Sequence, residues 1–376
     1  MAFERRQEGM SDTVIDARVK GPTIDDLGAW RPEEIPEIAG ILAMKRHWSG
    51  NLFLKVRDEY EAATRGMGPL DHATARPIVE GLRTLRYMLW YDRFCQDRMW
   101  QTVGRIVGSR MDEWAKAIEP RPDDLGTLET VGDFTYPGYY ETLDFHRQDG
   151  GVWRDVRGAV VYMLGARLVH VGRNDRFELH DHIARAIEMP TPPKRILDIG
   201  CGFGKNAFSL KARWPDAEVH GIDLAAPCLA LARRMATERN LTIHWRQADA
   251  ELLPDPSDGY DLITIAMVMH ELPKPAIDNV LREALRVLRP GGRLVMLENR
   301  YIGDPLRDWV LAWHSDLIAE PYWRPWRDLD PAAECRAAGF AEARTEKWYT
   351  PHFTPAMEAD PRKWFIPWGM TTAVKG

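Results

Sequence analysis

The chain has 376 residues, of which 45% are hydrophobic, and a formal net charge of -6 at pH 7. This length allows two domains, or one large catalytic domain with a second unit. The acidic balance excludes the positive field that attracts nucleic acid, so we expect a small-molecule substrate and no nucleic-acid partner. The longest apolar runs have the length of strands, which predicts no membrane span. The charged N-terminus lacks an apolar signal core, which predicts a cytoplasmic protein.

The first half of the chain is predicted to be mainly helical. Residues 1–30 are polar and predict a flexible arm. Residues 31–150 carry apolar side chains at helical intervals and predict a helical N-terminal domain, in which the Pro-, Gly- and Tyr-rich stretch 119–150 is a lid or connector. Residues 151–190 regain helical spacing and predict linking helices that end before a strand. The helices and aromatic side chains of this half also fit a homodimer interface.

From residue 191 to residue 376 the pattern changes to short apolar runs that alternate with amphipathic helices. Such alternation is typical of an α/β domain whose parallel sheet is covered on both faces. The stretch near the end of the chain, 365–374, predicts an antiparallel last strand. The other expected strands are 195–199, 218–223, 242–247, 262–266 and 293–298.

A glycine turn follows the first of these strands. Gly200, Gly202 and Gly204 come directly before an expected helix. Glycine lets a ligand approach the backbone closely and adopts turn conformations that other residues resist. Asp223 ends the second strand, where a carboxylate can accept hydrogen bonds from both hydroxyls of a ribose. A nicotinamide or flavin site shares these features, but its fingerprint needs a small third residue where Lys205 stands.

The glycine spacing, after Ile-Leu-Asp-Ile, resembles motif I of the class I methyltransferases that use S-adenosyl-L-methionine (SAM). Residues 247–250, 260–265 and 284–294 resemble later motifs of that family in the same order, and the last of them contains the Pro-Gly-Gly turn. The chain is similar to small-molecule methyltransferases of the ubiquinone/menaquinone type from about residue 194 onward. The resemblance implies a Rossmann-like sheet, mostly parallel and seven-stranded with an antiparallel last strand, preceded by the mainly helical N-terminal domain.

The resemblance also implies how the cofactor is bound, with S-adenosyl-L-homocysteine as its product. Asp198 and Gly200 are expected at the methionine end and Asp223 at the ribose, and the helices of 151–190 are expected over this site. Asp249 with Ala250 is expected at the adenine. Leu224 is expected to lie against the purine. The remaining cofactor candidates are Cys201, Gly202 and Gly204 in the glycine turn and Met267 after the fourth strand.

The rim after the fourth strand carries the leading catalytic candidate. His270 lies at the carboxyl end of the sheet, where ligands of such folds bind, and neutral histidine suits a general base. The alternative is a structural histidine that caps or orients a helix. Glu271 could pair with His270 or cap the next helix. The loop 137–151 is rich in polar and aromatic residues and adds Tyr140 and His146 as catalytic candidates. The alternative is that it is a surface loop held together by its own aromatic rings.

No metal site is predicted, because His180 and His182 point to different faces of a helix. The sequence therefore predicts an enzyme of the EC 2.1.1 type that transfers a methyl group to oxygen, carbon, sulfur or nitrogen of a small molecule, with His270 as a candidate base. Two alternatives stay open. One is a SAM-binding enzyme of another reaction, such as cyclisation, and the other is a degenerate fold that serves as a dimerisation or scaffold protein.

Overall fold

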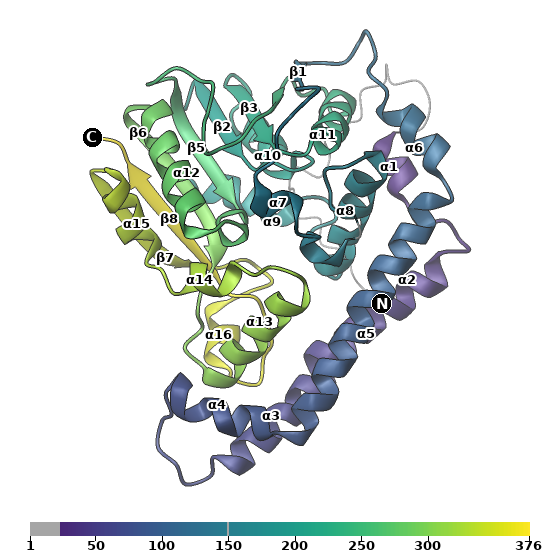
Figure 1. Ribbon diagram of the computed structural model, residues 1–376, viewed down its shortest axis with the longest axis vertical. Helices are drawn as coiled ribbons and strands as arrows, with labels where there is room; N and C mark the ends of the chain where they lie inside the picture. Colours follow the sequence, from purple (N-terminus) through teal and green to yellow (C-terminus); the bar gives the residue numbers. More distant parts are fainter. Residues whose placement is uncertain (1–22, 149) are drawn as a thin grey trace.

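The computed structural model describes residues 23–148 and 150–376 (Figure 1). A twisted sheet with helices on its faces forms one part of the molecule, and a long helical arm extends from its side. The flexible arm expected over 1–30 lies outside the described residues up to residue 22. From residue 23 the expectation is wrong, because the chain forms α1 (Ile24–Gly28) and the Ile24 N–H donates to the Glu238 carboxylate at 2.9 Å.

The sheet is mostly parallel, with the strand order β1-β4-β3-β2-β5-β6-β8-β7. Neighbouring strands pair in parallel from β1 to β6, while β8 lies antiparallel to both β6 and β7. The predicted sheet type and its antiparallel last strand are therefore confirmed. The strands are β1 (Leu128–Glu129), β2 (Arg195–Ile199), β3 (Glu218–Asp223), β4 (His244–Gln247), β5 (Tyr260–Ala266), β6 (Leu288–Asn299), β7 (Glu342–Trp348) and β8 (Trp368–Val374).

The prediction of seven strands is wrong by one, because part of the expected lid or connector joins the sheet. Leu128 and Glu129 of β1 pair with β4, and the Trp245 N–H donates to the Thr127 carbonyl at 2.9 Å. Gly126 permits this approach: its φ is +67°, and a Cβ there would lie 1.9 Å from the Ile243 carbonyl oxygen. The connector thus satisfies backbone groups along an edge that β4 would otherwise expose.

The N-terminal helices and the sheet share one hydrophobic core. Ile24, Ile41, Met99, Leu164 and Trp368, from five separate segments, belong to the same buried cluster. The predicted divisions at residues 150 and 190 therefore do not separate independent cores. The helices around the sheet are α7 (Gly138–Glu141), η3 (Phe145–Arg147), α8 (Val156–Val169), α9 (Glu178–Ala186), α10 (Lys205–Arg213), α11 (Ala226–Glu238), η4 (Met269–Glu271), α12 (Lys274–Val287), α14 (Trp323–Arg327), α15 (Pro331–Ala338) and α16 (Pro355–Ala359).

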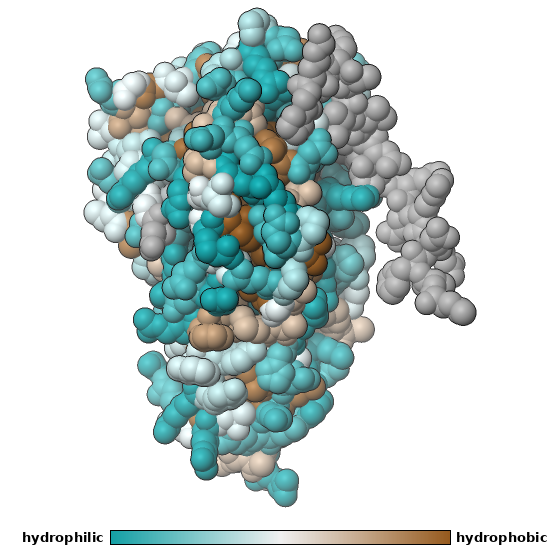
Figure 2. All heavy atoms as spheres, turned by 90° about the vertical axis from the view of Figure 1, so that its right-hand side faces the viewer, coloured by the Kyte–Doolittle hydropathy of each residue, from teal (hydrophilic) through white to brown (hydrophobic). Residues whose placement is uncertain are grey.

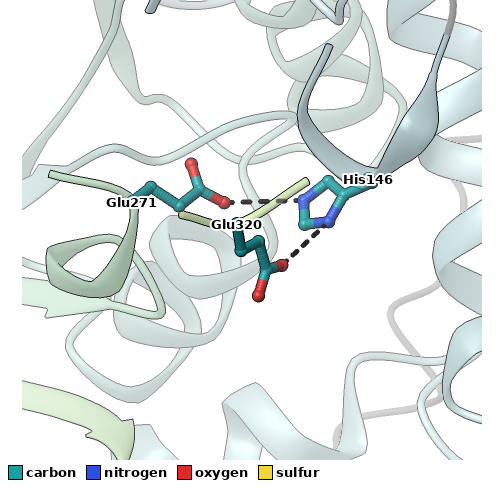
Figure 3. Close-up of side chains that lie close together, drawn as sticks. All are labelled: His146, Glu271 and Glu320. Carbon is teal, nitrogen blue, oxygen red and sulfur yellow. Dashed lines mark ion pairs between the residues drawn. The ribbon is translucent and has the colours of Figure 1, made fainter. Parts of the chain in front are cut away.

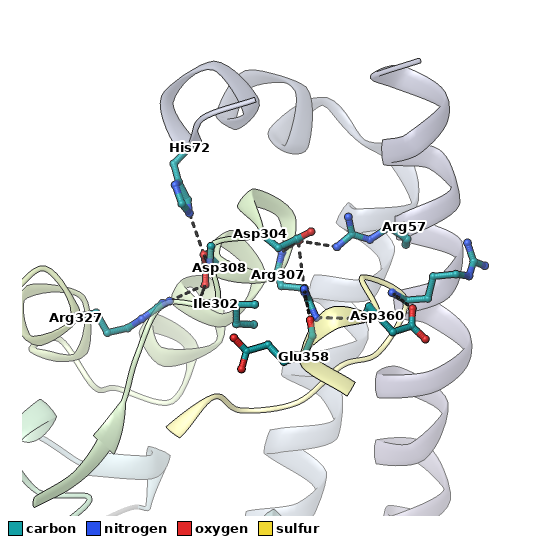
Figure 4. Close-up of polar contacts among 11 residues, drawn as sticks. Arg57, His72, Ile302, Asp304, Arg307, Asp308, Arg327, Glu358 and Asp360 are labelled. Carbon is teal, nitrogen blue, oxygen red and sulfur yellow. Dashed lines mark hydrogen bonds and ion pairs between the residues drawn. The ribbon is translucent and has the colours of Figure 1, made fainter. Parts of the chain in front are cut away.

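The helical arm is anchored at its far end to α13 (Pro305–Leu317). A second buried cluster joins helices of the arm to Leu306 and Val310 of α13. Two ion pairs add to this contact: Arg57 with Asp304 at 2.6 Å, and His72 with Asp308 at 2.9 Å (Figure 4). The arm consists of α2 (Ile35–His47), η2 (Trp48–Leu52), α3 (Phe53–Ala63), α4 (His72–Gly81), α5 (Arg83–Gly108) and α6 (Met111–Ile118).

The surface in Figure 2 is largely hydrophilic, with smaller hydrophobic patches between polar side chains. On α5, the aromatic side chains of Tyr87, Trp90 and Phe94 are about half exposed and follow one another along one face. Homodimer formation through these helices stays a prediction.

None of the described helices combines the length and apolar composition needed to span a membrane.

Candidate active site

A cavity of about 520 Å³ lies at the carboxyl ends of the central strands. Its lining includes the turn after β2, the end of β3 and the segment after β5, where ligands of open α/β sheets bind. It continues to side chains of α2, α5, α8 and α13 and to residues 350–368. The lining of the cavity therefore comes from segments spread between Lys45 and Trp368.

The glycine turn lets the backbone reach this cavity. Gly200 has a φ of +65°, and a Cβ there would lie 2.5 Å from the Val268 side chain. Gly200, Cys201 and Gly202 line the cavity, as predicted for a cofactor loop. Gly204 is not among the lining residues. Its φ is +91°, and a Cβ there would lie 2.7 Å from Phe208 and from Trp245, so Gly204 serves helix packing.

Asp198 offers one free carboxylate oxygen in the lining. It is 1% exposed, and its Oδ1 accepts hydrogen bonds from Asn206 at 2.6 Å and Thr264 at 2.7 Å. Its Oδ2 has no hydrogen-bond partner among the described residues, and neither has the Oδ1 of Asn206. Both side chains line the cavity. An ammonium group, such as that of the methionine part of SAM, would satisfy both acceptors, so these residues fit the cofactor.

Asp223 lies at the end of β3 and lines the same cavity. Its two carboxylate oxygens each accept a 2.8 Å bond from a backbone N–H, that of Gly202 and that of Ala225. Burial raises the pKa of this carboxyl. Because each oxygen keeps a second lone pair, the carboxylate can still accept hydrogen bonds from two ribose hydroxyls.

The other cofactor candidates also lie on the cavity wall: Leu224, Asp249, Ala250 and Met267. Asp249 accepts a bond from the Glu251 N–H at 2.9 Å, and burial raises its pKa. Leu224 is held by its carbonyl, which accepts a 3.0 Å bond from Gln247. The structure thus brings together the predicted cofactor residues other than Gly204, and their roles stay proposals.

Three titratable side chains meet at the other end of the cavity (Figure 3). His146 lies 3.5 Å from Glu271 through Nε2 and 3.1 Å from Glu320 through Nδ1. The ring of His146 is also parallel to that of Tyr162, with centroids 5.9 Å apart. We call His146, Glu271 and Glu320 the acceptor cluster. Their ligand atoms lie within 4.8 Å of one another, so the cluster could also hold a divalent cation.

The acceptor cluster contains a carboxyl group that titrates near neutral pH. Burial raises the pKa of Glu271 to about 7, although His146 and His270 lower it. Burial also raises the pKa of Glu320, but His146 and His270 outweigh this effect and bring it below its usual value. Burial lowers the pKa of His146, which Glu320 and Glu271 nevertheless raise. The carboxylates thus favour the protonated form of His146, and Glu271 is the carboxyl of the cluster whose pKa lies near neutral pH.

His270, the candidate base of the sequence, lines the cavity and is bound by a carboxylate. It is 5% exposed, and its Nδ1 lies 2.6 Å from Glu298. Burial lowers its pKa, but Glu298 and the carboxylates of the acceptor cluster outweigh burial and raise it to about 9. Glu298 also accepts 2.8 Å bonds from the N–H groups of Val268 and Met269. The contacts of His270 and Glu298 therefore help to fix the turn after β5, and whether His270 is a base or a structural residue stays a prediction.

Tyr140 forms part of the wall. Burial raises the pKa of its phenol far above the usual value, so the phenol stays neutral. Its ring lies between those of Tyr136 and Phe145. These contacts are packing contacts, and the catalytic role of Tyr140 stays a prediction.

Sequence reasoning missed three residues of the site. Asn206 and Lys205 begin the helix after the glycine turn, a position that in itself signals contact with a bound group. Glu320 gave no such signal, because its partner His146 is far from it in the chain. All three line the cavity.

Comparisons with known proteins agree with this geometry. Residues 196–292 match a family model described as a methyltransferase domain. The chain is 42% identical over 139 residues to a demethylmenaquinone methyltransferase of Thermus thermophilus, an alignment that covers 36% of this chain and 60% of the relative. It is 32% identical over 128 residues to a ubiquinone/menaquinone biosynthesis C-methyltransferase of Cereibacter sphaeroides, covering 34% of this chain and 50% of that one.

Among solved structures, a phosphoethanolamine N-methyltransferase of Haemonchus contortus in complex with SAM is 18% identical, with a TM-score of 0.41, and the match covers 64% of this chain and 60% of that one. The chain thus spans 50% to 60% of the curated relatives named above. The ordered motifs, the sheet and the matching family model show that this chain contains a class I methyltransferase domain whose cofactor is SAM.

Proposed function

We propose that this protein transfers the methyl group of SAM to a small-molecule acceptor that binds beside the acceptor cluster. The observation that carries the proposal is that one cavity is lined both by Asp198 and Asn206, each with a free acceptor oxygen, and by His146 and Glu271. A cofactor held at the first end and an acceptor at the second would meet without crossing solvent. Holding two reactants in contact supplies much of the rate enhancement of such a reaction.

The cofactor supplies a methyl group on a positively charged sulfur, which needs no further activation. Asp198, Asn206 and Asp223 would hold it in place. Bound there, the cofactor would supply the methyl group to the acceptor atom, and the Glu271 carboxylate would take the proton that the acceptor atom loses. His146, held by Glu320, stays within 3.5 Å of Glu271 and would fix its orientation.

The walls of the acceptor end support a flat, hydroxylated ring as the acceptor. Tyr139, Phe145, Tyr162 and Trp323 contribute aromatic surface, on which a ring can stack. The two curated relatives carry the names of menaquinone and ubiquinone methylation. A quinol fits both observations, because it offers an acidic hydroxyl and a nucleophilic ring carbon.

The first test is calorimetric binding of SAM and S-adenosyl-L-homocysteine to the wild type and to Asp223→Ala. We expect binding by the wild type and a fall in affinity of about 100-fold or more in the variant, since two charge-assisted hydrogen bonds are lost. Asp216→Ala, an exposed site outside the cavity, is the matched control. A wild type that binds neither ligand would contradict the proposal and favour a scaffold role.

The second test identifies the reaction. Labelled SAM is incubated with the protein and a panel of benzoquinols and naphthoquinols, and the products are analysed by mass spectrometry. Transfer of the label to an acceptor supports methyl transfer. Consumption of the cofactor without an added methyl group would instead support the alternative reaction, such as cyclisation.

A further inference from the structure

The cavity also reaches the helical arm, where polar side chains from three helices line it. They are Lys45 of α2, Asp92 and Gln96 of α5, and His314 of α13, and we call them the arm subsite. The Asp92 carboxylate lies 2.7 Å from Nδ1 of His314, and this contact joins α5 to α13. Asp92 and Gln96 are one helical turn apart on α5, so their side chains lie on the same face of the helix.

Gln96 is an unpartnered polar group in this part of the wall. It is 4% exposed, yet its side-chain amide forms no hydrogen bond with any residue that the structure describes. Leaving a buried donor or acceptor unsatisfied costs about 1–3 kcal/mol. A ligand in the cavity that accepts a hydrogen bond from the amide would remove this cost.

Lys45 adds a positive charge near Asp92. Its Nζ donates to the thioether sulfur of Met99 at 3.8 Å, which is a weak acceptor, and an ammonium has three hydrogens to donate. No carboxylate of a described residue lies within ion-pair distance of Lys45. Burial lowers the pKa of Lys45, and Asp92 opposes this effect from a greater distance. The arm subsite therefore offers the donors of Lys45 and Gln96 to a ligand, while the near carboxylate is engaged by His314.

The arm subsite adjoins the acceptor cluster through α13. The Glu320 N–H donates to the carbonyl of Ser315, the residue after His314, at 3.0 Å. Aromatic rings border the arm subsite, since Trp48 lies 5.9 Å from His314 and 5.0 Å from Trp364, measured between ring centroids. A flat ring can therefore lie between the arm subsite and the acceptor cluster.

Three other cations also line the cavity, but they differ from Lys45 in their surroundings. Arg46 and Arg173 are exposed, so water weakens their attraction for an anion. Lys205 belongs to α10 and lies over the rings of Phe203 and Tyr162, at 4.8 and 5.8 Å from their centroids. Lys45 is the one that shares the wall with the unpartnered amide of Gln96.

We propose that the arm subsite binds a carboxylate carried by the acceptor ring, with Lys45 as its counter-ion and Gln96 as a hydrogen-bond donor. This inference rests on the proposed function, because it assumes that the acceptor occupies this cavity. It narrows the acceptor to an aromatic acid, whose carboxylate lies at the arm subsite while its reacting atom lies at the acceptor cluster.

The test compares two probes of nearly the same shape, 2-naphthoate and the neutral 2-naphthamide. Their binding is measured by calorimetry, with and without S-adenosyl-L-homocysteine, on the wild type, Lys45→Met and Lys45→Arg. We expect the wild type to bind 2-naphthoate about 10-fold or more tightly than 2-naphthamide, because a charge-assisted contact forms. Lys45→Met should remove this preference and Lys45→Arg should keep most of it. Lys55→Met, an exposed lysine of the same arm, is the control.

A second variant tests the other donor. Gln96→Leu should weaken the binding of both probes about 3- to 10-fold, because both carry an oxygen that can accept its hydrogen bond. Gln101→Leu, an exposed glutamine of the same helix, is the matched control. Thermal unfolding of each variant shows whether a loss of binding comes from a loss of the fold.

Three outcomes would overturn the inference. In the first, the wild type binds neither probe, or binds both equally. In the second, Lys45→Met keeps the preference for 2-naphthoate and Arg46→Met or Lys205→Met removes it, so the carboxylate has another partner. In the third, folded Gln96→Leu binds both probes as the wild type does. If the probes behave as expected but labelled SAM transfers no methyl group to any acceptor, the proposed function fails and the arm subsite stands, so the two failures are distinguishable.

Discussion

The two ends of the cavity are assembled in different ways. The cofactor end takes its candidate side chains from the stretch 198–250 and from Met267, where strand ends and the glycine turn place them. The acceptor end gathers side chains from 139–162, 270–271, 311–323 and 350–368, as well as from the helical arm. The first arrangement follows from local backbone geometry, whereas the second depends on packing between distant segments. The comparison suggests that cofactor binding and acceptor binding can be disturbed separately.

The largest effect on catalysis without an effect on SAM binding is expected from Glu271→Gln. An amide keeps the size of the side chain but cannot take the proton, so we expect kcat to fall about 10²- to 10⁴-fold while SAM binding stays unchanged. In the wild type, kcat should rise as Glu271 loses its proton near pH 7 and level off above that pH. Steady-state kinetics between pH 5.5 and 9 measure both the loss of kcat in the variant and the pH dependence of kcat in the wild type. Glu342→Gln on β7 is the control, and a variant with near-normal kcat would show that another group accepts the proton.

The second prediction separates acceptor binding from SAM binding through the contact between the helical arm and α13. Arg57 is 4% exposed in its ion pair with Asp304, and removing one partner of such a buried pair costs about 3–5 kcal/mol. Arg57→Met should therefore lower the Tm and raise KM for the acceptor, with little effect on the affinity for SAM. Arg76→Met is matched to it, because Arg76 pairs with Glu80 on the surface of the same arm. Equal losses of SAM and acceptor binding would show that the two ends are not separable.

The smallest effect is a change in the pH dependence of stability. The pKa of His270 is raised in the folded state, so its contribution is fully present below its unfolded pKa of about 6.5 and is lost as pH rises through about 9. We expect the Tm of the wild type to fall over this window more steeply than that of His270→Gln. Thermal unfolding at several pH values measures the difference. Parallel curves would mean that His270 is not protonated in the folded protein.

Much of the cofactor end could be predicted because its signals are local. Gly200 and Asp223 follow directly from a glycine turn and from the end of a strand, so their placement needs no knowledge of the remaining fold. Asn206 was overlooked although its place at the start of α10 signals contact with a bound group, and its unbonded oxygen is visible only in the structure. Lys205 entered the sequence argument solely as the residue that does not fit a dinucleotide fingerprint.

The acceptor end could be predicted only in part. His146 and Glu271 were candidates because polar residues in loops near strand ends often carry function, but nothing in the sequence paired them. Glu320 follows α13, and its meeting with His146 depends on how α13 packs against α4 and α14. His270 lies where it was expected, but the sequence did not reveal its partner Glu298 at the end of β6.

The far edge of the sheet has a consequence for the behaviour of the protein at high concentration. β7 pairs with β8 on one side, and its sequence, Glu-Ala-Arg-Thr-Glu-Lys-Trp, places charged side chains along a largely exposed strand. An edge strand can act as a template on which another chain adds, and charged side chains oppose such growth. Replacing Glu346 and Arg344 by valine would turn this edge into a site for aggregation, without any contact to the cavity.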